Sequence, residues 1–165
     1  MSGASYNNGK SEQTVCTPKD FLNAVEERFG QLEYDLACTK ENCVGAHGGI
    51  GPGNRIIDSL SIDWQEYFCK DTTLWLNPPF GNIPQWAKKC AEMRFLPSWT
   101  LLLVPASVGA NWWRDYVKDN AMVYYLNGRI KFVGHKDAYP KDLALVAYGF
   151  GAAGETIWTW KKKTA

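Results

Sequence analysis

The feature that most restricts the possible folds is an uninterrupted apolar run in the second half of the chain. Residues 100 to 104 read Thr-Leu-Leu-Leu-Val, and the run stops at Pro105. A strand without polar alternation is typical of a sheet that is covered on both faces. The run therefore predicts a strand buried on both of its sides.

Strand and helix patterns alternate through the first two-thirds of the chain. Thr17 and Pro18 are typical of a helix N-cap and a first helical position, and Gly30 is typical of a helix end. Apolar residues recur at helical spacing in three places: Phe21, Leu22, Val25 and Phe29; Trp86, Ala87, Cys90 and Ala91 after Pro84; and Trp112, Trp113, Tyr116 and Val117. Strands are predicted at 32–36, 73–76, 100–104, 122–126, 143–150 and 156–160. This order predicts an α/β fold, with helices on the faces of a sheet and a β-rich end.

Length and composition predict a single domain. A chain of 165 residues with 45% hydrophobic residues can form one core. The small, polar residues 1–13 predict a flexible lead-in, so the domain is expected to span residues 14–165, with a glycine-rich irregular stretch at 45–53. The 18 basic and 17 acidic residues nearly cancel, so any contact with nucleic acid has to be local.

The cysteines indicate neither a disulfide framework nor a metal site. They are odd in number and scattered, at positions 16, 38, 43, 69 and 90. Cys38, Cys43 and His47 come nearest to a metal pattern, but a fourth ligand is missing nearby. Unpaired thiols, no bound metal and a cytoplasmic location are therefore expected, and the sequence has no secretory or membrane-length apolar segment.

The segment with the most chemical information directly follows the predicted strand at 73–76. Residues 77 to 80 read Asn-Pro-Pro-Phe. The carboxyl ends of strands in open α/β sheets are where ligands bind. Two consecutive prolines fix their own φ angles and keep Asn77 extended, so the loop is rigid before any substrate arrives.

A rigid loop of this composition suits chemistry on an aromatic amine. The exocyclic nitrogen of adenine is a poor nucleophile because its lone pair is delocalised into the ring. If the Asn77 side-chain oxygen and the Pro78 carbonyl accept its two hydrogens, the lone pair is directed toward a methyl donor. Phe80 offers a flat face on which an extruded base can stack. The alternative is a plain strand end, with Asn77 as a cap and Phe80 in the core, and the four residues alone leave both readings open.

The four residues Asn77, Pro78, Pro79 and Phe80 resemble the Asn/Asp-Pro-Pro-Tyr/Phe catalytic motif of amino-methyltransferases. From about residue 15 to 150 the chain also resembles the compact N6-adenine DNA methyltransferases of bacteriophages and prophages. The resembling segments are, in order, 17–18, 34–42, 60–64, 102–106 and 127–132. The resemblance implies a compact, single-domain, Rossmann-like class I methyltransferase fold with a mixed sheet. It also implies methyl transfer from S-adenosylmethionine to adenine N6 in DNA, with short or relaxed sequence specificity.

The resemblance further implies a cofactor site at the amino-terminal side of the domain. Thr17 and Pro18 would border the methionine end of S-adenosylmethionine. Asp35 and Ala37 would lie near its ammonium group or ribose, where a carboxylate suits a cation and hydroxyl donors. The glycine-rich turn usual in methyltransferases is absent, and residues 35–39 stand in its place.

Two further pairs of residues are candidates for binding. By the same resemblance, Asp63 would accept a hydrogen bond from the cofactor's adenine amine and Trp64 would pack beside that ring, although Trp64 also suits the core. Alternation in the segment 128–132 places Arg129 and Lys131 on one face, where they would hold DNA phosphates near a flipped base. Lys136, Tyr139 and Lys141 would extend this surface.

Two alternatives to a DNA adenine methyltransferase stay open. One is a methyltransferase that acts on RNA or on a protein amide, and the other is an inactive nucleic-acid-binding relative.

Overall fold

The computed structural model describes residues 15–38, 44–46, 58–68 and 71–162. The predicted lead-in at 1–13 and most of the glycine-rich stretch at 45–53 lie outside these described residues. The prediction of one domain over residues 14–165 stays a prediction for the same reason.

A mixed sheet forms the centre of the molecule, with six strands among the described residues. The strands are β1 (Tyr34–Asp35), β2 (Thr73–Leu76), β3 (Trp99–Pro105), β4 (Met122–Asn127), β5 (Leu143–Tyr148) and β6 (Gly154–Thr159). Their order across the sheet is β1-β2-β3-β5-β4-β6. β1, β2 and β3 are mutually parallel, β5 runs antiparallel to both β3 and β4, and β6 runs parallel to β4.

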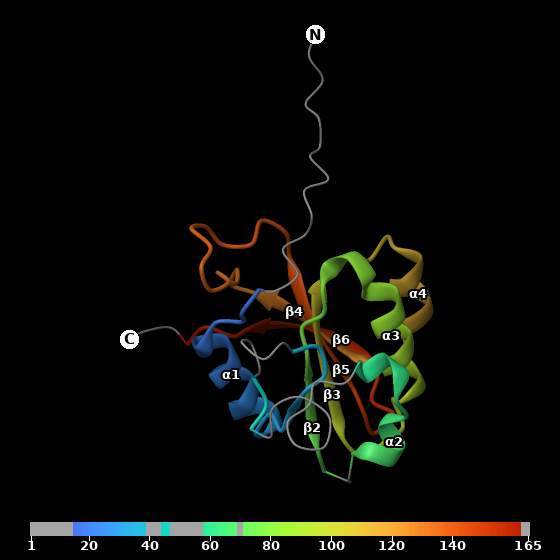
Figure 1. The fold of residues 1–165 in the computed structure, drawn as a ribbon. Helices are drawn as coiled ribbons and strands as arrows, with labels where there is room; N and C mark the ends of the chain where they lie inside the picture. The colour runs from blue at the N-terminus through green and yellow to red at the C-terminus, as the bar shows by residue number, and fades with distance from the viewer. Residues whose placement is uncertain (1–14, 39–43, 47–57, 69–70, 163–165) are drawn as a thin grey trace.

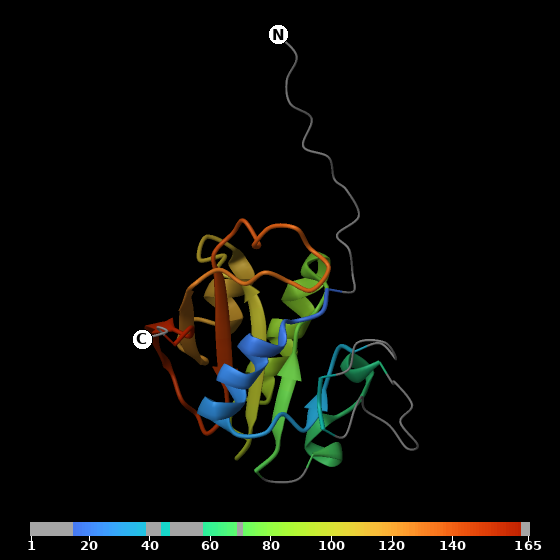
Figure 2. The ribbon, with the colours of Figure 1, turned by 90° about the vertical axis from the view of Figure 1, so that its left-hand side faces the viewer.

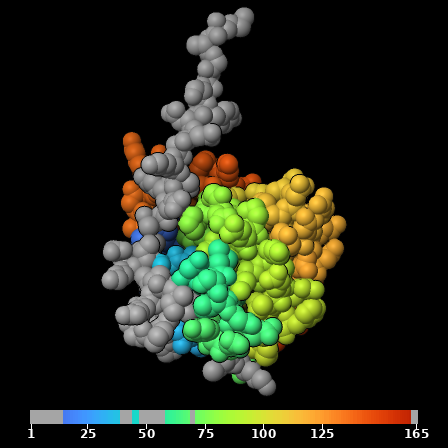
Figure 3. Space-filling model, turned by 45° about the vertical axis from the view of Figure 1, so that its right-hand side comes forward, coloured from blue at the N-terminus to red at the C-terminus, as the bar shows by residue number. Residues whose placement is uncertain are grey.

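Helices cover both faces of this sheet, as the alternation of patterns predicted. The α-helices of the described part are α1 (Lys19–Phe29), α2 (Trp64–Tyr67), α3 (Ile83–Glu92) and α4 (Asn111–Tyr116), with short 3-10 turns η1 (Ser59–Ser61) and η2 (Phe80–Asn82). Figures 1 and 2 show α1 on one face and α3 and α4 on the other. Figure 3 shows the second face from outside, where α2 and η1 adjoin α3.

The apolar run at 100–104 is buried on both sides, as predicted. Leu102 and Val104 point into the cluster beneath α3 and α4, whereas Leu101 and Leu103 point into the cluster beneath α1. Each of the four side chains is fully buried. Because successive strand residues face opposite sides, only a sheet covered on both faces needs such a run.

The chain start and the first strand differ from the prediction in two details. Pro18, not Thr17, is the N-cap of α1, and it makes no side-chain capping hydrogen bond. The Thr17 hydroxyl contacts Asn77 instead. The strand predicted at 32–36 shortens to Tyr34–Asp35, and its alternation does not hold, because Asp35 is buried.

The cysteines differ from the prediction of unpaired thiols at one position. Cys16 and Cys90 are free, but Cys38 is disulfide-bonded. Sequence separation gives no information on which thiols the fold brings within bonding distance, so the pairing was missed. Within the described ranges, no helix is long and apolar enough to cross a membrane.

Candidate active site

The Asn77–Phe80 loop lies at the edge of the sheet where the parallel strands end. β2 ends at Leu76, and the loop leads through η2 into α3. The first turn of α3 contains Pro84, which needs no backbone hydrogen bond there. The loop therefore occupies the place in an α/β sheet at which ligands usually bind.

The Asn77 side chain is held in one orientation by the segment that precedes α1. Its amide nitrogen Nδ2 donates to the Val15 carbonyl oxygen at 3.2 Å and to the Thr17 hydroxyl oxygen at 3.1 Å. A carbonyl only accepts hydrogen bonds, so the nitrogen, not the oxygen, has to face Val15. Among the described residues no group donates to Asn77 Oδ1, and this oxygen is left as an available acceptor.

Phe80 is half-buried and contacts another aromatic residue. The Phe80 and Tyr139 ring centroids lie 5.6 Å apart with an interplanar angle of 72°. Tyr139 in turn meets Phe132 at 5.8 Å and 84°. Burial raises the pKa of the Tyr139 hydroxyl, which is thus neutral at physiological pH. Phe80 also packs partly against the core, so the alternative prediction, which placed Phe80 in the core, is partly correct.

Three segments distant in sequence meet at this edge of the sheet: residues 15–17, 77–80 and 130–139. The first and third are joined by the Val133 amide, which donates to the Cys16 carbonyl at 3.0 Å. Figures 1 and 2 both show the 128–142 loop beside the segment that leads into α1. The loop encloses a cavity of about 240 Å³ lined by Phe132 and residues 135–140.

Asp35 is the last residue of β1 and pairs in the sheet with Trp75 of β2, which precedes Asn77 by two residues. The carboxylate is 5% exposed, and its two oxygens accept from the backbone amides of Ala37 at 3.1 Å and Val44 at 3.2 Å. Burial raises its pKa from 3.8 to about 6, although both hydrogen bonds act in the opposite direction. The group thus closes the turn after β1 and becomes charged only as neutral pH is approached.

The other predicted cofactor residues have structural partners. The Asp63 carboxylate caps α2 by accepting from the Gln65 amide at 2.9 Å. Trp64 is fully buried, and its indole N–H donates to the Ser59 carbonyl at 2.7 Å. These contacts match the core role that the sequence left open for Trp64, and a cofactor contact for this pair stays a prediction.

The predicted DNA-binding pair lies on one face, although the segment is not a strand. Arg129 and Lys131 are exposed, whereas Ile130 and Phe132 between and after them are buried. Arg129 spans the base of the loop, because its Nη1 donates to the Pro140 carbonyl at 2.7 Å and its Nη2 lies 3.8 Å from Asp142. Lys131 has no such anchor within the part of the chain that the structure describes.

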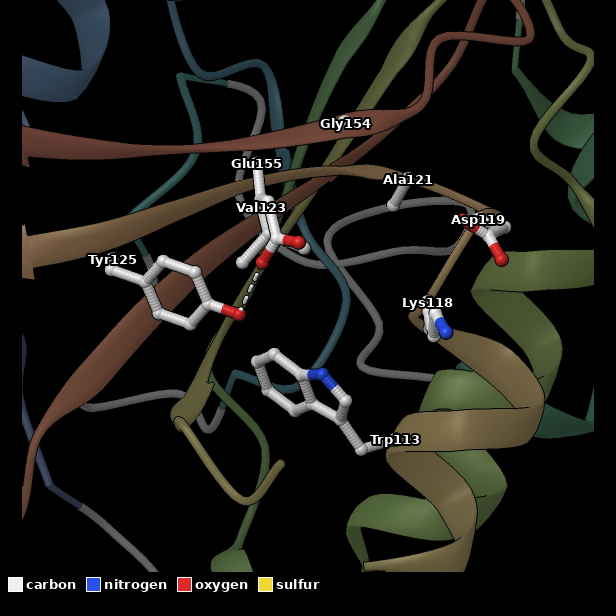
Figure 4. A pocket seen from close by; sticks show the side chains of 8 residues that line it. All are labelled: Trp113, Lys118, Asp119, Ala121, Val123, Tyr125, Gly154 and Glu155. Atoms are coloured by element: carbon white, nitrogen blue, oxygen red, sulfur yellow. Dashed lines mark hydrogen bonds between the residues drawn. The ribbon is translucent and has the colours of Figure 1, made fainter. Parts of the chain in front are cut away.

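A second, smaller pocket lies between α4 and the strands β4 and β6 (Figure 4). There the Tyr125 hydroxyl donates to Glu155 at 2.8 Å, and the Tyr125 ring stacks on Trp113 at 6.3 Å. Its volume is about 50 Å³, and no predicted site residue lines it. In the described ranges no group of three or more His, Cys, Asp or Glu side chains is placed to hold a metal ion.

Sequence reasoning found the loop but missed what holds it. Val15 belonged to no predicted site, Phe132 was named only within the resembling segment 127–132, and Thr17 was predicted as a helix cap and a cofactor contact. The contact between Thr17 and Asn77 spans sixty residues, and no local pattern reports it.

Comparison with known proteins extends over most of the chain. Residues 7–144 match the family of DNA N-6-adenine-methyltransferases (Dam). A DNA N-6-adenine-methyltransferase of Escherichia phage T1 is 22% identical over 130 residues, which cover 76% of this chain and 51% of the relative. The chain therefore spans about half the length of this relative. All of the predicted site residues fall within the matched range.

Proposed function

The chain belongs to the DNA N-6-adenine-methyltransferase family, and on that premise we propose that it methylates the N6 amine of adenine in DNA. S-adenosylmethionine would supply the methyl group. The single observation that carries the proposal is the orientation of Asn77, whose amide nitrogen is doubly bound and whose oxygen is left to accept.

Asn77 acts on the target amine by accepting one of its hydrogens. The Pro78 carbonyl accepts the other, so the nitrogen lone pair turns out of the plane of the adenine ring. Because the amide is already oriented, little reorganisation is needed when the base enters the site. No general base has to be strongly basic, which agrees with a loop whose only polar side chain is an amide.

Phe80 provides the surface for the extruded adenine. The Tyr139 ring meets it in a T-shaped arrangement, and a base would stack on a face of the Phe80 ring. A base flipped from the duplex loses its neighbours in the stack, and an aromatic face replaces part of that contact.

Asp35 suits the cationic end of the cofactor. It stands at the carboxyl end of β1, adjacent to the strand that leads to Asn77. Each carboxylate oxygen accepts one backbone amide and keeps a further lone pair. Thr17, Pro18 and Ala37 complete the proposed cofactor surface, and Asp63 with Trp64 is its less direct part, since both have other partners.

The remaining finer proposals concern fold, substrate and location. The three parallel strands with a ligand edge at their carboxyl ends support a Rossmann-like class I fold. Lys131 would bind a phosphate directly, and Arg129 would do so with the N–H groups that Pro140 does not use. By the family resemblance, sequence specificity would be short or relaxed. The reaction would take place in the cytoplasm of a bacterial host, where methylation would protect phage DNA from restriction.

The decisive experiment measures transfer of labelled methyl from S-adenosylmethionine to unmethylated duplex DNA, with nucleoside mass spectrometry of the product. We expect N6-methyladenine from the wild type and none from Asn77→Ala, while cofactor affinity stays within about threefold because Asn77 acts on the other substrate. Asn120→Ala, in an exposed turn before β4, is the matched control and should keep full activity.

Three outcomes would redirect the proposal. Label found only in RNA or only in protein would support the corresponding methyltransferase. Failure of the folded protein to bind S-adenosylmethionine would support a nucleic-acid-binding relative without activity. Loss of folding in Asn77→Ala would mean that the loop is structural.

A further inference from the structure

We infer that Thr17 is a positioning residue for the transfer reaction, because its hydroxyl oxygen anchors the Asn77 amide that the Val15 carbonyl orients with Oδ1 left to accept from the target amine. This inference rests on the proposed function. It assigns Thr17 a task toward the DNA substrate, which differs from the cofactor contact that the family resemblance implies.

The contact is a part-buried hydrogen bond of ordinary length. Thr17 Oγ1 accepts from Asn77 Nδ2 at 3.1 Å, and Thr17 is only 7% exposed. The Val15 carbonyl takes the second hydrogen of the same nitrogen at 3.2 Å. Both donors of the amide are therefore used by the segment before α1.

The orientation matters because an asparagine amide has two similar rotamers that exchange its oxygen and its nitrogen. In the exchanged rotamer, Oδ1 would face the Val15 carbonyl, and two acceptors would repel each other. The amine of the target would then meet an N–H donor instead of an acceptor. The Val15 carbonyl, which can only accept, excludes this rotamer. The Thr17 hydroxyl can donate as well as accept, so it anchors the amide group that Val15 has oriented. Thr17 is the part of the pair that a side-chain substitution can remove.

The segment that carries Thr17 is itself anchored on both sides. The Cys16 carbonyl accepts from the Val133 amide at 3.0 Å, and the Pro18 carbonyl accepts from the Leu22 amide at 3.1 Å in the first turn of α1. Thr17 is thus fixed between the 128–142 loop and α1, so its hydroxyl is in place before Asn77 binds a substrate.

The test compares Thr17→Val, which keeps the side-chain shape but removes the acceptor, with Thr17→Ser, which keeps the acceptor. Thr100→Val, a buried Thr→Val change within β3, is the matched control. Single-turnover methyl transfer to duplex DNA is measured at saturating S-adenosylmethionine, and cofactor affinity is measured separately by calorimetry. All variants are first checked by thermal melting.

We expect Thr17→Val to slow single-turnover transfer about 10- to 100-fold, the range for leaving one buried donor without its partner. Cofactor affinity should change less than about threefold, and Thr17→Ser and Thr100→Val should keep nearly the wild-type rate. A weaker cofactor affinity with an unchanged rate at saturation would overturn the inference and make Thr17 a cofactor ligand. An equal loss in Thr100→Val, or a melted Thr17→Val together with an inactive Thr17→Ser, would overturn it as well.

The wild type separates this inference from the proposed function. If the wild type makes no N6-methyladenine, the proposed function fails and the positioning role fails with it. If the wild type is active and Thr17→Val is equally active, the positioning role fails alone.

Discussion

Asn77 and Asp35 both stand at strand ends, but the fold treats their polar atoms differently. The Asn77 amide nitrogen donates to the segment before α1, and the amide oxygen is left available as an acceptor. Asp35 uses both oxygens on backbone amides and is nearly excluded from solvent. The first arrangement leaves a group for substrate, whereas the second creates a carboxylate whose charge depends on pH.

The stability contributed by Asp35 should fall as the pH rises toward neutral. Its pKa in the folded protein, about 6, lies above the ordinary 3.8, so the folded state binds the proton more tightly. The stabilisation of the folded state by protonated Asp35 is therefore complete below pH 3.8 and is lost as the pH rises through about 6. Between about pH 4 and pH 7, wild type should lose on the order of 3 kcal/mol relative to Asp35→Asn, measured by urea unfolding. A difference between the two proteins that is independent of pH would contradict this.

Phe80 should act through its ring face. We expect Phe80→Leu to raise KM for DNA about 5- to 50-fold, since base stacking on an aromatic ring is worth about 1–3 kcal/mol. Phe80→Tyr should stay near wild type, because the ring is kept. Steady-state kinetics with a short duplex measures both, and equal effects of the two substitutions would argue that Phe80 only fills the core.

At the scale of the elements, the end of β6 ties three parts of the fold together. Trp160 follows β6, donates its indole N–H to the Gly128 carbonyl at 2.6 Å and meets the Phe21 ring of α1 at 5.0 Å. The glycine accommodates a positive φ of 107° at the start of the 128–142 loop. One side chain thus connects the sheet edge, α1 and the base of the loop beside the site.

Trp160→Phe should destabilise the protein by about 1–3 kcal/mol, because the Gly128 carbonyl loses its partner in a partly buried place. Trp112→Phe is the matched control, since Trp112 is half-exposed on α4 and its indole makes no hydrogen bond to another described residue. Urea unfolding of both variants measures the difference. Equal losses in the two would show that ring size alone matters.

Gly45 allows residues 44–46 to cover the free edge of β1. A Cβ atom there would lie 2.6 Å from the Glu33 carbonyl oxygen and 2.7 Å from the Tyr34 Cα, both backbone atoms that cannot rotate away. Gly45→Ala should lower the free energy of unfolding by about 1–3 kcal/mol. It should also displace the Val44 amide, which donates a hydrogen bond to the Asp35 carboxylate. Gly109→Ala meets no atom within 4 Å and should melt close to wild type. Thermal melting of Gly45→Ala and Gly109→Ala measures this difference in stability.

At the scale of the whole molecule, the protein is a sheet whose centre is buried on both faces and whose β6 edge is exposed. β3 and β5 are buried along almost their whole length, whereas β6 is exposed at nearly every residue and Ile157 is 72% exposed. Local opening costs least where few apolar contacts are lost. The stability of the domain is therefore expected to decrease from the centre of the sheet toward β6.

Hydrogen exchange should report this gradient directly. We expect the slowest amide exchange in β3 and β5, near the global unfolding limit, and exchange in β6 faster by at least about tenfold. Mass spectrometry of peptides from the three strands measures it. Protection of β6 equal to that of β3 would mean that another surface covers this edge in solution.

Local patterns predicted most of the elements but not their arrangement. The helix at 19–29, the strand at 73–76 and the helix opened by Pro84 lie where hydrophobic spacing and turn residues placed them. The four-residue helix α2 was missed, because a single turn carries too little periodicity to be recognised. The antiparallel position of β5 between β3 and β4 was also beyond prediction, since no local signal specifies which strands pair.

The sequence by itself determined the α/β class, the two-sided burial of β3 and the rigid Asn-Pro-Pro-Phe loop, because these follow from the period of apolar residues and from the restricted φ of proline. Only the tertiary structure decided the orientation of the Asn77 amide, the burial of Asp35 and the contact of Tyr139 with Phe80. These depend on residues that are about sixty positions apart, or on how loops close over a strand end. Chemistry of this kind is set by distance in space, which hydrophobic spacing along a chain does not encode.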